Sequence, residues 1–305
     1  MKRWAPLLIV LLALGCVSQA SHSNGLVVLE FGPDFSVVHQ NEIVTFRARV
    51  QNQGSFPARN VWMELLGLDQ DFCCTPAGQG PWRGGEKAPE EPECRYEEKH
   101  RDLKPPDPFW GTPGDELYCR WVYKVPDFKP GFKKTYNVIL RIFSTYETDH
   151  LEKIQILSAA EILEGKPFPI TRIEETFSPL KLEVSLPQPV RYNYDESTQS
   201  LEVPIEILVR NVGDGTPCLK NECKKPTEGW DKVQLKLEKA DGMKIDCFEQ
   251  ENPITLELYR DEARIGCRLK IENIKGTGGE ERTLHFKLIY SYFQDQQTTL
   301  TVEAI

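Results

Sequence analysis

Apolar and polar residues alternate along most of the chain in short runs, and this period of two is typical of half-buried β-strands. A clear run in the first half is VTFRARVQNQG (44–54), which ends in Asn-Gln-Gly. In the second half, VPIEILVRNVG (203–213) alternates in the same way and ends in Asn-Val-Gly. Turn signals such as Pro130-Gly131 separate further runs of this kind. The pattern predicts an all-β protein.

The two runs belong to a longer internal repeat. Each is followed by a second alternating run, at 60–65 in the first half and at 232–237 in the second. Farther on, the matching runs CRWVY and CRLKI begin with Cys119 and Cys267. The same register continues to the end of the chain. The two halves are therefore predicted to be two copies of one unit.

Several short strands per copy, each with one apolar face, bury that face by packing one sheet on another. The sequence predicts two tandem immunoglobulin-like antiparallel β-sandwiches stapled by disulfides, at 24–157 and 180–305, joined by a linker at 158–179. An insertion rich in Cys, Pro and Gly, 71–115, lies within the first. The stretch 152–163 is the one helical candidate, and a strand that runs on into the linker is the alternative.

The first 20 residues have the pattern of an export signal. Two basic residues at 2–3 precede an apolar run at 5–15, which is too short to span a bilayer. Small residues in SQA (18–20) permit ordinary cleavage. Alternatively, LALGC (12–16) resembles a bacterial or archaeal lipobox with Leu and the small residue in reversed order, in which Cys16 would carry a lipid. Both alternatives predict an exported protein of the cell surface or extracellular space, and the second predicts a lipid anchor.

Nine cysteines occur, and apart from Cys16 they fall four in each half. Even numbers in an exported chain predict disulfides. A zinc site is the alternative, but Cys218-x4-Cys223 is the nearest approach to ligand spacing and the histidines are scattered. The repeat favours four bridges: Cys74–Cys119, Cys73–Cys94, Cys218–Cys223 and Cys247–Cys267. Exchange of Cys73 for Cys74 in the bridge to Cys119, and a strained bridge between these two neighbours, are the alternatives.

The stretch VTFRARVQNQGSFPARNVWMELLGLD (44–69) resembles the CARDB family, the cell-adhesion-related domains of bacteria and archaea. In that family a strand ends in Asn-x-Gly, a short turn follows, and the next strand carries alternating apolar residues. The second copy keeps Asn211 and Gly213 but has a Cys-rich insertion where the short turn would be. The resemblance implies a seven-stranded sandwich on a surface protein, and it brings no catalytic residues.

Charge and motifs exclude several classes of function. With 37 Lys and Arg against 46 Asp and Glu, the net charge is -9, and no basic stripe offers a surface for nucleic acid. There is no Gly-x-Ser-x-Gly, no phosphate-binding loop and no His-Glu-x-x-His, so no enzyme, cofactor or metal site is predicted. The Glu-rich stretch 86–102 lacks the spacing of a calcium loop and is predicted to be a solvated strip.

Four aromatic residues of the insertion are candidate contact residues, because rigid rings give a large contact area at a small entropy cost. The alternative is that they pack back over an open end of the sandwich. The four candidates are Trp82, Tyr96, Phe109 and Trp110.

These patterns lead to two hypotheses of function. The first is a non-enzymatic surface protein that acts in binding, adhesion or spacing, with a protein or a surface glycan as partner. The second is a structural or accessory subunit of an envelope or filament assembly, which uses exposed sheet edges such as 299–305.

Overall fold

A computed structural model describes residues 25–69, 72, 101–165, 177–192, 200–224, 226–274 and 279–304. The predicted export signal with Cys16 lies outside the described residues, as do Trp82 and Tyr96. The same holds for Cys73, Cys74 and Cys94.

The described part of the chain consists of β-sheets with a few short helical segments, so the all-β sandwich prediction is confirmed. The strands pair antiparallel except for β2 with β16 and β9 with β7, which are parallel. In the first half the strands are β1 (Leu26–Pro33), β2 (Val37–His39), β3 (Ile43–Asn52), β4 (Ala58–Leu66), β5 (Arg101–Leu103), β6 (Glu116–Lys124) and β7 (Lys133–Ser158). In the second half they are β8 (Leu180–Ser185), β9 (Val190–Tyr192), β10 (Ser200–Asn211), β11 (Thr216–Cys218), β12 (Lys232–Ala240), β13 (Met243–Ile245), β14 (Ile254–Glu257), β15 (Glu262–Glu272) and β16 (Glu280–Glu303). The helices are α1 (Ala159–Leu163), α2 (Pro226–Gly229) and a 3-10 turn, Asp246–Phe248.

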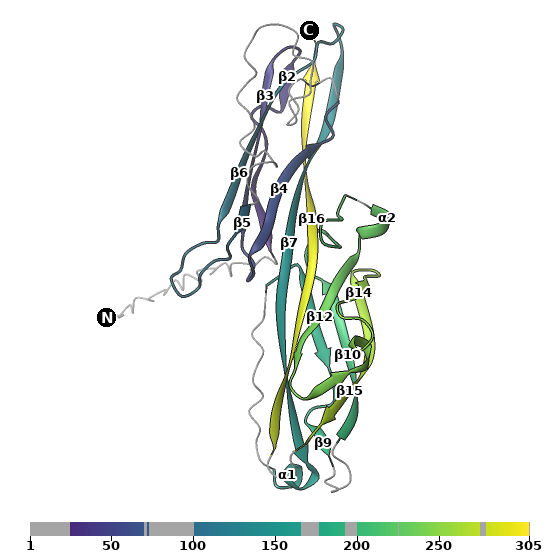
Figure 1. The fold of residues 1–305 in the computed structure, drawn as a ribbon. Helices are drawn as coiled ribbons and strands as arrows, with labels where there is room; N and C mark the ends of the chain where they lie inside the picture. Colours follow the sequence, from purple (N-terminus) through teal and green to yellow (C-terminus); the bar gives the residue numbers. More distant parts are fainter. Residues whose placement is uncertain are drawn as a thin grey trace, which may run out of the picture.

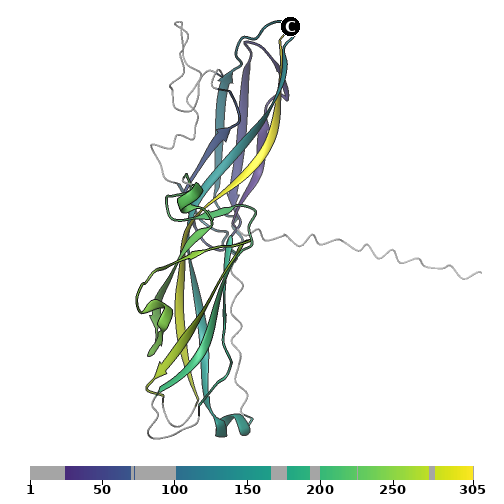
Figure 2. The same cartoon turned by 90° about the vertical axis from the view of Figure 1, so that its right-hand side faces the viewer.

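Two long antiparallel strands run through both halves of an elongated molecule (Figures 1 and 2). β7 is the last strand of the first copy and β16 the last strand of the second, and they pair continuously from Lys133 opposite Glu303 to Ile156 opposite Glu280. They form the centre of a nine-stranded sheet with the order β14-β12-β16-β7-β4-β5, to which β2, β9 and β11 attach. We call the β7–β16 pair the central ribbon.

Two smaller sheets pack on this large one. Their strand orders are β1-β3-β6 in the first half and β13-β15-β10-β8 in the second. Even-numbered side chains of the central ribbon are buried in both halves, for example Leu140 and Ile154 of β7, and Phe286 and Val302 of β16. Because side chains on one face of a strand recur every second residue, both cores lie on the same face of the ribbon. One apolar cluster runs through both sandwiches.

The sequence repeat and the strand pairing share one symmetry. The offset of 148 residues that relates Cys119 to Cys267 also relates Ser144 to Tyr292, and these two residues pair directly in the central ribbon. A local two-fold axis therefore crosses the ribbon at this pair. We call the region around the Ser144–Tyr292 pair the waist.

The last strand of each copy extends into the sandwich of the other copy. The end of β7 pairs with β9 of the second copy, and the end of β16 pairs with β2 of the first. The boundaries 24–157 and 180–305 stay a prediction about the repeat, while in space the two sandwiches share the ribbon. The helical candidate 152–163 divides at Ser158: β7 ends there, and Ser158 caps α1 through a reciprocal pair of bonds with Glu161.

The C-terminal strand is an interior strand. Residues 301–303 pair with β2 on one side and with β7 on the other. The prediction that 299–305 offers an exposed edge is therefore wrong for residues 301–303. The physical reason is that β16 is long enough to re-enter the first sandwich, and no local pattern reveals a pairing over such a sequence distance.

The Asn-x-Gly motif forms the same turn in both copies. The Asn side-chain oxygen accepts a bond from the backbone N–H of the Gly two residues on, and the side-chain nitrogen donates to the carbonyl four residues on. The distances are 3.0 and 2.9 Å at Asn52, and 3.3 and 2.9 Å at Asn211. The motif that marks the repeat is thus structural, because it satisfies the backbone where a strand turns.

Two disulfides join the cysteine pairs that the repeat favours. Cys218 bonds to Cys223 and Cys247 to Cys267, with Cα–Cα distances of 5.3 and 5.7 Å. Cys119 is fully buried and disulfide-bonded, and since its predicted partner lies outside the described residues, the Cys74–Cys119 bridge stays a prediction. No helix in the described ranges is both long and apolar enough to cross a membrane.

The two described bridges are expected to differ in their contribution to stability. Residues 247 and 267 are 20 apart in sequence, and residues 218 and 223 are 5 apart. Chain-entropy arguments then give a loss of about 3 kcal/mol for the double Ala variant of the first bridge and about 2 kcal/mol for that of the second. Urea unfolding of both variants measures this order, and a larger loss at 218–223 would contradict it.

Candidate functional site

The loop between β5 and β6, residues 104–115, presents two exposed aromatic rings. Phe109 is 83% exposed and Trp110 75% exposed, and their rings meet edge to face at 4.9 Å. The Asp107 carboxylate accepts bonds from both backbone N–H groups, at 2.9 and 3.1 Å. The Asp107 N–H donates to the Thr112 carbonyl at 3.0 Å, which closes the turn on itself. We call Phe109 and Trp110 the aromatic tip.

The tip is held by hydrogen bonds within its own turn, and both rings are exposed to solvent. The alternative interpretation, that the aromatic rings of the insertion cover an open end of the core, is therefore wrong for Phe109 and Trp110. Their exposure makes them available to a partner. That Phe109 and Trp110 contact a partner stays a prediction. The other two candidates, Trp82 and Tyr96, lie outside the described residues.

The waist has a second concentration of aromatic and polar side chains, on the face of the ribbon opposite the cores. Here β4, β7 and β16 lie side by side, and their outward residues form rows across the three strands. In one row, the Arg141 guanidinium on β7 donates two hydrogen bonds to the Asp295 carboxylate on β16, at 2.8 and 2.7 Å. On the β4 side, Glu64 lies opposite Arg141. Burial raises the pKa of Glu64, and the nearby charges of Lys224 and Arg141 oppose this rise.

The next row is aromatic. The ring of Trp62 on β4 stacks on that of Phe143 on β7, with 3.9 Å between the ring centroids. The centroid of Phe143 lies 5.9 Å from that of Phe293 on β16, which in turn lies 4.9 Å from that of Trp230. Outward positions of a sheet normally face water. These rings are covered instead by the segment that follows β11, with which they form a separate apolar cluster around the Cys218–Cys223 bridge.

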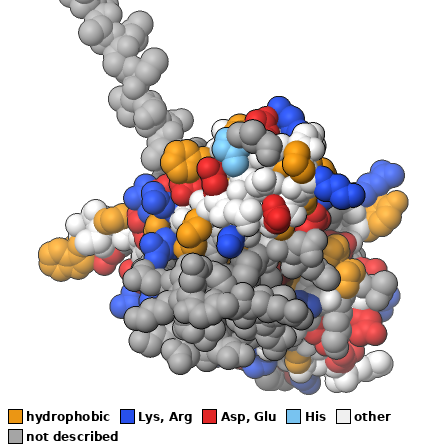
Figure 3. All heavy atoms as spheres, turned by 90° about the horizontal axis from the view of Figure 1, so that it is seen from above, with side chains coloured by type: hydrophobic (Ala, Val, Ile, Leu, Met, Phe, Trp, Pro, Cys, Tyr) orange, Lys and Arg blue, Asp and Glu red, His pale blue; other side chains and the backbone are white. Residues whose placement is uncertain are grey.

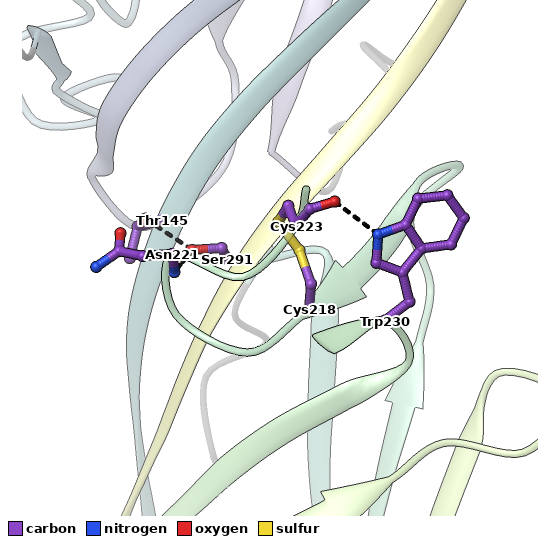
Figure 4. The surroundings of a disulfide bond; sticks show 6 residues. All are labelled: Thr145, Cys218, Asn221, Cys223, Trp230 and Ser291. Atoms are coloured by element: carbon purple, nitrogen blue, oxygen red, sulfur yellow. Dashed lines mark hydrogen bonds between the residues drawn. A yellow bond between two sulfur atoms is a disulfide. The ribbon is translucent and has the colours of Figure 1, made fainter. Parts of the chain in front are cut away.

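Hydrogen bonds hold this segment against the ribbon (Figure 4). The backbone N–H of Asn221 donates to the Ser291 hydroxyl at 3.1 Å, and Ser291 and Thr145 share a hydroxyl–hydroxyl bond of 3.0 Å. The Trp230 indole N–H donates to the Cys223 carbonyl at 2.6 Å. The disulfide and these bonds fix residues 218–224 over the strands. We call these residues the waist loop.

An ion pair network borders the waist loop. The Glu147 carboxylate accepts a bond from Lys220 at 3.0 Å and pairs with Arg59 at 3.2 Å. The hydrogen bond from Lys220, followed by the charges of the neighbouring cations, lowers the pKa of Glu147. The carboxylate therefore stays ionised and ties the waist loop to β7.

One group of residues has the spacing of metal ligands among those that the structure describes: Asp246, Cys247 and Cys267. Both sulfur atoms belong to a disulfide, and the Asp246 carboxylate accepts the backbone N–H of Arg268 at 2.9 Å. The group is therefore structural. Seen from the end that holds β2, the described surface mixes basic, acidic and apolar side chains without a patch of one sign (Figure 3).

Sequence reasoning predicted the tip as a candidate contact site but missed the waist. The sequence predicts the Cys218–Cys223 bridge only as a link within the Cys-rich insertion of the second copy. The available signal was that this insertion interrupts the repeat directly before Trp230. The partners of the loop on β4 and β7 are too distant in sequence for any local pattern to connect them.

Comparison with known proteins adds little. No family model matches the chain, and no curated protein matches it. Among solved structures, a collagen adhesin from S. aureus aligns with a TM-score of 0.11 and 7% identity, over 93% of this chain and 94% of that chain. A likeness of this size carries no argument, so the fold described above rests on its own strand pairing.

Proposed function

We propose that the protein is a non-enzymatic binding protein of the cell surface or extracellular space, which contacts its partner through the aromatic tip. The observation that carries the proposal is the exposure of Phe109 and Trp110, 83% and 75%, on a turn fixed by its own hydrogen bonds. Contiguous exposed rings are uncommon without a partner, and pre-ordered aromatic residues dominate many binding interfaces.

Three further features support this proposal. The disulfides are typical of oxidising compartments. The pattern of the first 20 residues favours export, with lipid attachment at Cys16 as the more specific version. The CARDB resemblance at 44–69 agrees with the proposed role, and the partner is proposed to be a protein or a surface glycan.

The alternative function, a structural subunit assembled through sheet edges, was based on an exposed C-terminal edge at 299–305. Residues 301–303 of the C-terminal strand are paired on both sides. An assembly role would therefore have to use other strands.

The proposal is tested by removing the tip. A Phe109→Ser, Trp110→Ser double variant is expected to reduce binding of the labelled protein to envelopes of its source cells by at least about tenfold, because an aromatic hot spot of an interface contributes about 2 kcal/mol or more. Tyr259→Ser is the matched control, since Tyr259 is also 75% exposed but lies on another turn. Undiminished binding by the double variant would refute the role of the tip, and absence of binding by the natural protein would refute the binding function.

A further inference from the structure

The waist contains a cleft that the proposed function does not use. Its volume is about 220 Å³, and it lies between the waist loop and the outward face of β4, β7 and β16. Six of its lining residues carry the argument: Asn60, Trp62, Thr145, Asn221, Lys224 and Ser291. Figure 4 shows Thr145, Asn221 and Ser291 next to one another where the waist loop crosses the ribbon.

Among the described residues, one hydroxyl proton on the floor of the cleft has no acceptor. Thr145 and Ser291 are 4% and 5% exposed, and together they own two hydroxyl protons. One of these lies in the bond between the two oxygens, and the Ser291 oxygen also accepts the Asn221 N–H. Whichever hydroxyl donates in the shared bond, the other proton has no acceptor within the described part of the chain. A buried donor of this kind favours a ligand oxygen.

The rim of the cleft offers further polar groups, among them Lys224, whose charge also acts on Glu64. The side-chain amides of Asn60 and Asn221 make no hydrogen bond to any described residue, and both residues have positive φ, 52° and 66°. The Lys224 ammonium has no carboxylate within 4.0 Å among the described residues, and it lies over the Trp62 ring at 4.5 Å. Two amides, one hydroxyl proton and one cation thus surround the face of an indole.

This combination selects a class of ligand. An aromatic face beside amides and a hydroxyl suits a sugar ring, whose C–H face packs on the indole while its hydroxyls bond to the amides. A cationic ligand is disfavoured by Lys224, and a purely apolar one would leave the buried donor unpaired. The volume is smaller than the roughly 300–1,000 Å³ of sites for drug-sized ligands, so it fits a single ring.

We propose that the waist cleft binds one acidic sugar ring of the uronic acid class, with its carboxylate paired to Lys224. The ring replaces the ammonium on the Trp62 face, and Lys224 turns to the carboxylate. The residues belong to β4, β7, β16 and the waist loop, whereas the tip belongs to the β5–β6 loop. The site is therefore independent of the proposed contact at Phe109 and Trp110.

The test is calorimetric titration of the intact protein with glucuronate, galacturonate, glucose and acetate. At least one of the two uronates is expected to saturate with a Kd in the millimolar range or below, while acetate does not and glucose binds at least about tenfold more weakly. Lys224→Gln is expected to remove the preference for the uronate over glucose. Asn60→Gly, which removes an amide and keeps the positive φ accessible, is expected to weaken both sugars.

A matched control separates the cleft from general charge effects. Lys239→Gln removes a lysine that is 69% exposed and paired with Asp241 outside the waist, and this variant is expected to bind like the natural protein. Lack of saturation by both uronates up to about 20 mM, above the millimolar range of weak ligands, would overturn the proposal. Equal binding of glucose, or an unchanged uronate Kd in Lys224→Gln, would overturn the acidic class. If the Phe109→Ser, Trp110→Ser variant showed that the tip binds nothing, the expected results of this titration would stay the same.

Discussion

Replacing Phe286 with alanine is expected to lower the stability of both sandwiches together, by about 3–5 kcal/mol, the usual cost of deleting a buried aromatic side chain. Phe286 is fully buried in the core of the second half. The same strand, β16, continues into the first half, where Leu300 and Val302 are fully buried. A loss of packing at one end of the central ribbon should therefore be transmitted to the other end.

Hydrogen exchange at increasing urea concentration measures this coupling. In the Phe286→Ala variant, β3 of the first half and β15 of the second are expected to lose protection in one transition at a lower urea concentration. Trp121→Ala is the reciprocal control, because Trp121 is 1% exposed in the core of the first half. It should affect the same two strands. If Phe286→Ala weakened β15 while β3 kept its natural protection, the two halves would be independent modules and the shared ribbon would not couple them.

Replacing Asn52 with alanine is expected to cost about 3–5 kcal/mol, a large effect for a polar residue. The Asn52 side chain is fully buried. It donates to the carbonyls of Phe56 and Leu103, at 2.9 and 2.8 Å, and accepts the Gly54 N–H at 3.0 Å. Alanine leaves these three backbone groups without partners, and each buried unsatisfied group costs about 1–3 kcal/mol.

The matching residue of the second copy supplies the comparison. Asn211 makes the equivalent bonds to Gly213 and Gly215, but it is only partly buried, so water can replace part of what alanine removes. Asn211→Ala is expected to cost roughly half as much as Asn52→Ala, and urea midpoints of the two variants measure the difference. Equal losses, or a larger loss at Asn211, would contradict the role given to burial.

The candidate sites could be predicted only as far as their chemistry is local. Phe109 and Trp110 were identifiable because they lie together in a segment rich in Pro and Gly, but whether they faced water or the core depended on the Asp107 turn. The waist cleft could not be predicted at all, because Trp62, Thr145, Asn221 and Ser291 come from four separate segments. They meet because β4, β7 and β16 are neighbours in one sheet.

The sequence alone determined the strand-forming pattern, the two copies and their turns, since alternation, Asn-x-Gly and the cysteine spacing each act over a few residues or repeat at a fixed offset. The register of β7 with β16, the waist at Ser144 and Tyr292, the burial of the C-terminal strand and the cleft were decided only by the tertiary structure. The physical reason is that strand pairing carries no sequence code of its own. A strand accepts any partner whose backbone and apolar face match, and which partner it takes depends on the packing of the whole chain.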